Sequence, residues 1–230
     1  MWLVFFAKNL NYTYERLKTS SYNAITHPMT ITPLFSSGML YATGYDEDIT
    51  NHIIEKRYLD LSSNEDNLLR DINQYIVYAT ILTTNENYEI KAKRAVASWS
   101  SIRLSNTSTT LLNTYIKKET PLGGDYWAIG SNHGTEPFAA GIMTYKHLEN
   151  SNLNNFYKYG IVGLNYSIAS VISLGRVEDG GHSVGDQFVN AAVGNFLGVF
   201  IHDFFMLNKN LQISIGLPTD ISYLNFQYSF

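Results

Sequence analysis

Residues 175–186 read Gly-Arg-Val-Glu-Asp-Gly-Gly-His-Ser-Val-Gly-Asp, and the rest of the chain is organised around this stretch. Arg176 can bind phosphate through the five donors of its planar guanidinium group. His182 can attack an electrophile or move protons near neutral pH. Asp186 follows one helical turn after His182, so its carboxylate could hold one imidazole nitrogen while the other reacts. The stretch therefore predicts a phosphate site with a reactive histidine.

The segments on either side of this stretch are predicted to be helices. Residues 152–174 carry apolar residues at near-helical spacing, and residues 184–206 are apolar on most sides, as expected of a central buried helix. Asn and His interrupt the second segment, so the sequence contains no run of about 18 clean apolar residues. We therefore expect a core helix here and no transmembrane span.

Earlier parts of the chain add further helical segments. The clearest covers residues 64–83, where Ser63 or Asn64 can serve as N-cap and the first turn is acidic. A long segment at 86–118 has a polar middle that could break it. The other segments predicted as helical are 33–41, 46–57 and 135–149.

The two ends of the chain differ from this helical centre. Residues 8–32 are polar with no clear period, and the N-terminal segment 1–32 is predicted to be irregular. Residues 207–230 alternate on either side of Pro218-Thr219-Asp220, which predicts a β-hairpin with Leu224, Phe226, Tyr228 and Phe230 on one face. We expect one domain over 1–230: an all-α bundle of about six helices at 33–206, followed by a short C-terminal hairpin.

Composition narrows the class of function. Only 16% of the 230 residues are charged and 14% are aromatic, which favours a surface that meets lipid or a partner. The net charge of −4 and the lack of a basic run argue against a nucleic-acid-binding surface, so no nucleic-acid partner is predicted. The absence of cysteine excludes disulfides, thiolate metal sites and cysteine nucleophiles. The apolar start Met1–Ala7 could be the remnant of a signal peptide or a buried strand.

A second polar motif lies well upstream of the first. Ser131-Asn132-His133 comes directly before Thr135-Glu136-Pro137, which is typical of a helix start with proline in the first turn. A helix N-terminus presents backbone N–H groups and partial positive charge, and so provides a seat for phosphate. The two motifs together predict a phosphate site assembled from separate helix ends.

In its motifs the chain resembles the type 2 phosphatidic acid phosphatase superfamily, which also includes bacterial acid phosphatases and vanadium haloperoxidases. The resemblance rests on the Arg-x5-His-x3-Asp spacing, on the upstream Ser-x-His before a helix, and on the order of these motifs. It covers roughly residues 64–206. The family motifs are Lys-x6-Arg-Pro, Pro-Ser-Gly-His and Ser-Arg-x5-His-x3-Asp.

The resemblance implies a role for each matching residue. His182 matches the nucleophile that forms a phosphohistidine, and Asp186 matches the carboxylate that orients it. His133 matches the general acid that protonates the leaving oxygen. Arg176 matches a phosphate clamp, and Ser131 matches the serine that contacts phosphate. Each role is sound chemistry, because cationic donors balance the charge of the equatorial oxygens during phosphoryl transfer.

The chain departs from the family pattern near both conserved histidines. Gly175 replaces the serine before the arginine. Asn132 replaces the glycine before His133 in the phosphate-binding segment, and Gly130 replaces the usual proline.

The first family motif departs furthest. Aligned on Pro121, its arginine position is Thr120 and its lysine position is Asn113. Neutral side chains therefore replace both cations of that motif, and Asn113 and Thr120 remain candidates for binding phosphate through hydrogen bonds. Lys117 follows Asn113 by four residues, so on a continuing helix it would share the same face. We expect Lys117 or Lys118 to replace part of the lost charge.

These observations predict a metal-independent phosphatase without a cofactor, acting on a phosphorylated lipid or a small phosphate ester at a periplasmic or membrane-peripheral location. Two histidines and an aspartate could also bind zinc, but an adjacent arginine argues against a nearby dication. One alternative is a degenerate homologue that binds an anion or lipid head group, or acts structurally, without turnover. Another is a vanadate-dependent peroxidase, although fewer cations are present than that chemistry uses. The sequence leaves the oligomeric state open.

Overall fold

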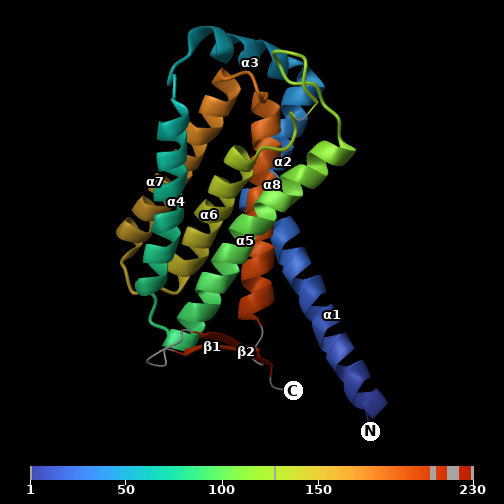
Figure 1. The fold of residues 1–230 in the computed structure, drawn as a ribbon, viewed down its shortest axis with the longest axis vertical. Helices are drawn as coiled ribbons and strands as arrows, with labels where there is room; N and C mark the ends of the chain where they lie inside the picture. Colours follow the sequence, from blue (N-terminus) through green and yellow to red (C-terminus); the bar gives the residue numbers. More distant parts are fainter. Residues whose placement is uncertain (1, 127, 208–210, 217–222, 229–230) are drawn as a thin grey trace.

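A computed structural model describes residues 2–126, 128–207, 211–216 and 223–228. The described residues are all-α apart from two short strands (Figure 1). The elements are α1 (Trp2–Thr26), α2 (Pro28–Thr43), α3 (Tyr45–Lys56), α4 (Ser63–Leu82), α5 (Tyr88–Tyr115), α6 (Asn132–Glu149), α7 (Asn155–Glu178), α8 (Val184–Met206), β1 (Leu211–Gly216) and β2 (Tyr223–Tyr228).

Helix α8 lies at the centre of the bundle, as its apolar composition predicts. It packs against α6, α2, α5 and α1, while α4 and α7 lie on the other side of α6 (Figure 1). Between Asp186 and Asp203 the helix contains no Asp, Glu, Lys or Arg, so it can be surrounded on several sides without burying an unpaired charge. Helix α3 crosses one end of the bundle (Figure 1).

Two glycines bring α8 unusually close to α6. A Cβ added at Gly194 would lie 2.4 Å from the carbonyl oxygen of Thr135, and one at Gly198 would lie 2.0 Å from Cγ2 of Ile142. Any side chain at these positions would therefore force the helices apart. Because α6 begins beside His133 and α8 begins just after His182, this close packing also places the two histidines at the same end of the bundle.

The prediction of an irregular segment at residues 1–32 is wrong. Helix α1 covers Trp2–Thr26, and α2 begins at Pro28 after the N-cap His27. The buried face of α1 contains Arg16, Ser20 and Ala24, spaced by four residues. Since two of these three side chains are polar, a search for apolar periodicity finds no helix here.

The predicted number of about six helices is therefore too low; the described residues form eight. Helix α1 was not anticipated. The separate segments predicted at 33–41 and 46–57 correspond to α2 and α3, and Gly44 takes a left-handed conformation between them, with φ of 76°. The polar middle of α5 does not break that helix. Its hydroxyl groups instead bond back to the preceding turn, as Ser105 does to the carbonyl of Ser101 at 2.9 Å.

The two strands pair antiparallel after α8. Leu211 is opposite Tyr228 and Gly216 is opposite Tyr223, and β1 lies against α5. The predicted turn at Pro218-Thr219-Asp220 and the terminal Phe230 lie outside the described residues.

Among the described residues, two helices are by length and composition apolar enough to cross a membrane, which the interrupted apolar runs did not lead us to expect. These are α7 and α8, and roughly half of each most apolar window is buried inside the bundle. Scattered Asn and Ser shorten every clean apolar run, but they do not lower the mean hydropathy enough to exclude a span.

Candidate active site

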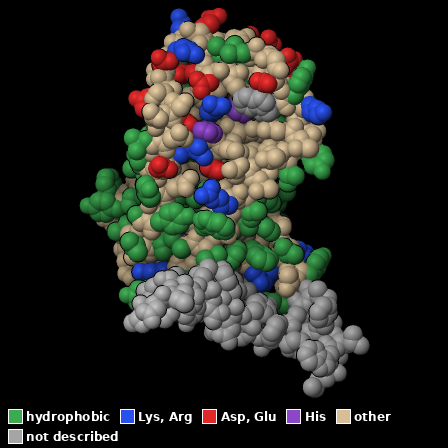
Figure 2. Space-filling model, in the orientation of Figure 1, with side chains coloured by type: hydrophobic (Ala, Val, Ile, Leu, Met, Phe, Trp, Pro, Cys, Tyr) green, Lys and Arg blue, Asp and Glu red, His purple; other side chains and the backbone are tan. Residues whose placement is uncertain are grey.

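A pocket of about 250 Å³ lies where the ends of α5, α6 and α7 approach the loop before α8. Figure 2 shows histidines beside basic and acidic side chains in this upper part of the molecule. Six residues singled out in the sequence meet in the pocket, although they come from three separate parts of the chain. They are Asn113, Ser131, Asn132, His133, Arg176 and His182.

His182 is held as a neutral imidazole in the pocket wall. Only 1% of the residue is exposed, and its Nδ1 hydrogen-bonds the backbone carbonyl of Ala128. A carbonyl can only accept, so Nδ1 carries the proton and Nε2 carries a lone pair. Desolvation lowers the pKa of His182 to about 4, aided by the nearby charge of Arg176 and opposed by the Ala128 carbonyl. The ring is therefore suited to nucleophilic attack at neutral pH.

Asp186 has different partners from those predicted. Its Oδ2 accepts hydrogen bonds from the backbone N–H and the hydroxyl of Ser183, both at 2.9 Å, and so caps α8. Its Oδ1 accepts from the Tyr41 hydroxyl at 2.7 Å and pairs with Lys118 Nζ at 2.8 Å. The carbonyl of Ala128, rather than this carboxylate, takes the orienting position on Nδ1 of His182. A backbone acceptor of this kind has no signature in sequence.

The lysines and Thr120 do not line the pocket, contrary to their predicted role. Helix α5 ends at Tyr115 and its C-cap is extended, so the helical spacing expected between Asn113 and Lys117 is lost. Lys118 instead forms ion pairs with Asp186 and, at 3.7 Å, with Asp46. The Thr120 hydroxyl donates to the carbonyl of Gly123 at 3.2 Å within the following turn.

Asn113 and Ser131 shape the backbone of the pocket. The Asn113 amide makes two 2.8 Å hydrogen bonds with the backbone of Gly130, one as donor and one as acceptor. Gly130 must be glycine, because an added Cβ would lie 2.5 Å from the carbonyl oxygen of Thr109. The Ser131 hydroxyl accepts from the backbone N–H of Gly134 at 3.2 Å and caps α6. Asn132 and His133 then occupy the first turn, where backbone N–H groups favour an anion.

Helix α4 supplies two functional candidates that sequence analysis missed. Nδ1 of His133 pairs with the carboxylate of Asp66. Nη1 of Arg70 lies 3.4 Å from Nε2 of the same ring, and Nη2 of Arg70 pairs with Glu136 at 2.6 Å. Asp66 and Arg70 are four residues apart and so share one face of the predicted helix. This spacing was the feature of the sequence from which the pair could have been found. Arg70 therefore places a cation beside the pocket of this chain, in which neutral residues replace both cations of the first family motif.

Both guanidinium groups near the pocket retain an unpaired donor. Arg176 donates from Nη1 to Asp179 at 3.1 Å, but its buried Nε has no hydrogen-bond partner among the described residues. The buried Nε of Arg70 is unpaired in the same sense. A buried unsatisfied donor is costly, and Arg176 lines the pocket, where its guanidinium group would favour an acceptor-rich ligand such as phosphate.

Similarity to known proteins is found in the fold of this chain. The sequence matches no protein-family model and no curated protein. The fold, however, is similar to that of a solved structure, a transmembrane phosphatidylglycerolphosphate phosphatase of the type 2 phosphatidic acid phosphatase (PAP2) type from Bacillus subtilis, with a TM-score of 0.51 and 12% identity over 80% of this chain and 96% of that chain. The predicted resemblance is confirmed at the level of fold.

Proposed function

We propose that this chain is a phosphatase that hydrolyses a phosphate monoester through a phosphohistidine on His182. The observation that carries the proposal is the meeting of His182, His133 and Arg176 in one pocket. These residues are distant in sequence, but they meet where several helices end. Phosphoryl transfer to a histidine requires a nucleophile, an acid and a cation close to one phosphate, and this arrangement supplies all three.

The proposed first step transfers the phosphoryl group to the protein. Nε2 of His182 attacks phosphorus while the bond to the leaving oxygen breaks. His133 donates a proton from Nε2 to that oxygen, which takes the place of the Arg70 contact at Nε2, while Asp66 holds the ring through Nδ1. Arg176, Arg70 and the α6 N-terminus stabilise the charge on the equatorial oxygens. No part of this step requires a metal ion from the protein.

The second step regenerates the site. His133, now neutral, accepts a proton from water as the water oxygen attacks phosphorus of the phosphohistidine. The phosphorus–nitrogen bond breaks and its electron pair returns to Nε2 of His182, so inorganic phosphate leaves and both histidines recover their initial states.

The distribution of charge supports a phosphorylated lipid as substrate and a membrane-associated location. No Asp, Glu, Lys or Arg occurs between Lys158 and Arg176 in α7, between Asp186 and Asp203 in α8, or within residues 72–85 around the end of α4. Figure 2 shows hydrophobic side chains in a band below the charged upper end that contains the pocket. An uncharged band of this kind fits a bilayer, with the pocket near its surface.

Release of inorganic phosphate tests the proposal directly. The purified protein should release phosphate from an aryl phosphate and from phosphatidic acid. The Arg176→Met variant should lose about 100-fold in kcat/KM, because a desolvated clamp on the transferring group is removed.

Arg57→Met is the matched control, since Arg57 also forms an ion pair with an aspartate three residues later, at the same 3.1 Å, but does not line the pocket. It should keep full activity. Wild-type protein that binds phosphate but releases no more of it than Arg176→Met would instead identify an anion-binding homologue without turnover.

The pH profile should show that the nucleophile stays neutral in acid. With the pKa of His182 lowered to about 4, the acid limb of kcat/KM should fall near pH 4 once substrate ionisation is corrected for. The same shift means that neutral His182 stabilises the fold fully above pH 6.5 and loses this contribution as the pH falls towards 4. An acid limb near 6.5 in a protein that remains folded would contradict the assignment.

A further inference from the structure

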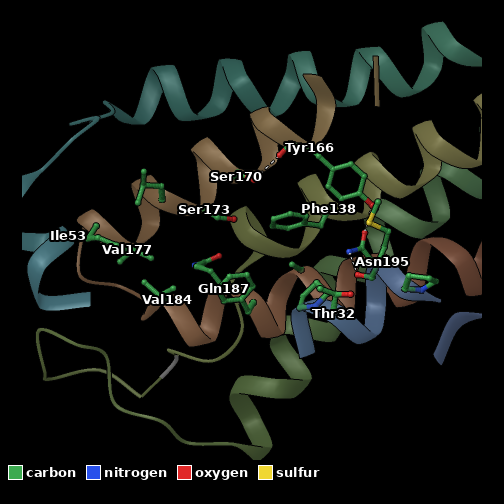
Figure 3. A pocket seen from close by; sticks show the side chains of 16 residues that line it. Thr32, Ile53, Phe138, Tyr166, Ser170, Ser173, Val177, Val184, Gln187 and Asn195 are labelled. Carbon is green, nitrogen blue, oxygen red and sulfur yellow. Dashed lines mark hydrogen bonds between the residues drawn. The ribbon is translucent and has the colours of Figure 1, made fainter. Parts of the chain in front are cut away.

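A second, larger pocket lies between α2, α7 and α8 with α6 as its floor. Its volume is about 410 Å³, within the range of small-molecule sites. Figure 3 shows that Ile53, Val177 and Val184 lie at one end of it, with Phe138, Tyr166 and Asn195 towards the other. None of the described residues that line it is Asp, Glu, Lys, Arg or His, which distinguishes it from the phosphate pocket.

Two polar side chains in this pocket have no partner in the described part of the protein. Both amide atoms of Gln187 and the hydroxyl of Ser173 are buried without a hydrogen bond, and each residue is only 6% exposed. Figure 3 shows them on α8 and α7, between the two ends of the pocket. A buried amide without a hydrogen-bond partner destabilises the protein, so a ligand that pairs with it relieves that cost.

Three other polar side chains of the pocket, Tyr166, Ser170 and Asn195, have hydrogen-bond partners within the protein. The Tyr166 hydroxyl donates to the Asn195 amide oxygen at 2.7 Å, and the Asn195 amide nitrogen donates to the carbonyl of Met29 at 2.6 Å. The chain also makes room for Gln187, because a Cβ at Gly134 would lie 2.3 Å from its Oε1. The unpaired amide of Gln187 is therefore packed closely against α6, beside side chains whose hydrogen bonds are already made.

We infer that this pocket binds a neutral single-chain acyl ester of a polyol, of the monoacylglycerol class. Nε2 of Gln187 donates to the ester carbonyl, a hydroxyl of the ligand donates to Oε1, and Ser173 adds a third hydrogen bond. The acyl chain lies along the apolar wall that includes Phe138 and Ala191. A charged head group is disfavoured, because nothing in this wall would pair with it. The inference requires no phosphatase activity.

Photolabelling tests the site in the full-length chain, purified in maltoside detergent. The probe is a monooleoylglycerol with a diazirine in the acyl chain, and labelled peptides are mapped by mass spectrometry. Labels should concentrate on α7 near Ser173 and on α8 near Ala191. The Ala191→Phe variant fills the pocket and should reduce this labelling at least about fivefold, by overpacking the space the chain needs.

The matched control uses a second apolar hollow on the opposite side of α8. Val193 lines that hollow with Leu111, Phe196 and Leu197. Val193→Phe should leave labelling near Ser173 unchanged. Labels spread evenly over the exposed apolar surface, or labelling near Ser173 that survives Ala191→Phe, would overturn the inference.

The Gln187→Leu variant separates specific binding from simple partition of a chain into an apolar space. Removing an unpaired buried amide should raise the Tm of the unliganded protein, whereas labelling by the monoacylglycerol should fall about tenfold, equivalent to about 1.4 kcal/mol. A plain alkyl diazirine should label wild type and variant equally. Equal labelling of both proteins by the monoacylglycerol would refute the role of Gln187.

Discussion

His182→Asn is expected to abolish phosphate release, with a loss of about 10⁴-fold or more in kcat. The substitution removes the nucleophile. Because the catalytic residues act together, losing the nucleophile removes most of the rate enhancement. The asparagine amide can still donate to the carbonyl of Ala128, so the loop before α8 should keep its shape. The measurement is acid- and base-quenched single turnover with a radiolabelled substrate, in which wild type forms an acid-labile, base-stable phosphoprotein and the variant forms none.

The control for this experiment is His52→Asn. His52 is exposed and its ring lies 3.0 Å from the Tyr58 hydroxyl, away from the pocket, so activity should be unchanged. His133→Asn should still form the phosphoprotein from an aryl phosphate with a good leaving group, because such a group needs little protonation. If His133→Asn lost the phosphoprotein while His182→Asn kept it, the roles of the two histidines would be exchanged.

Gly194→Leu is expected to destabilise the fold by about 3 kcal/mol or more and to remove activity with it. Even the first carbon of the new side chain would lie 2.4 Å from the carbonyl oxygen of Thr135, and backbone cannot move aside as a flexible side chain can. Separation of α6 from α8 would also move His133 away from His182. Thermal or denaturant unfolding in detergent gives the stability change, and phosphate release gives the functional change.

Gly163→Leu is the matched control for this glycine. It also lies inside a helix, α7, but a Cβ added there meets no atom within 4 Å. Since leucine favours a helix more than glycine does, Gly163→Leu should be neutral or stabilising. Comparable losses in both variants would show that close contact between α6 and α8 does not hold the pocket together.

The sequence by itself determined the helical fold and much of the pocket. Arg176 and His182 are joined by a short loop between two apolar segments, so both had to lie at one end of the bundle. The Thr135-Glu136-Pro137 pattern predicted a helix start close to His133, and the structure begins that helix three residues earlier, at Asn132, with Ser131 as its N-cap. These features depend on residues that are close together in the sequence. Hydrophobic periodicity and helix capping can therefore be recognised without a structure.

Only the tertiary structure decided which groups surround the two histidines. The partner of His182 is a backbone carbonyl at Ala128, which every residue type possesses and no spacing predicts. Asp186 caps its own helix and forms an ion pair with Lys118. Helix α5 ends at Tyr115, before Lys118, so this lysine does not share the helical face of Asn113 that lines the pocket. The extra cation came from Arg70, on a helix far away in the sequence. Hydrogen bonds and ion pairs of this kind depend on distances between elements, and packing sets those distances.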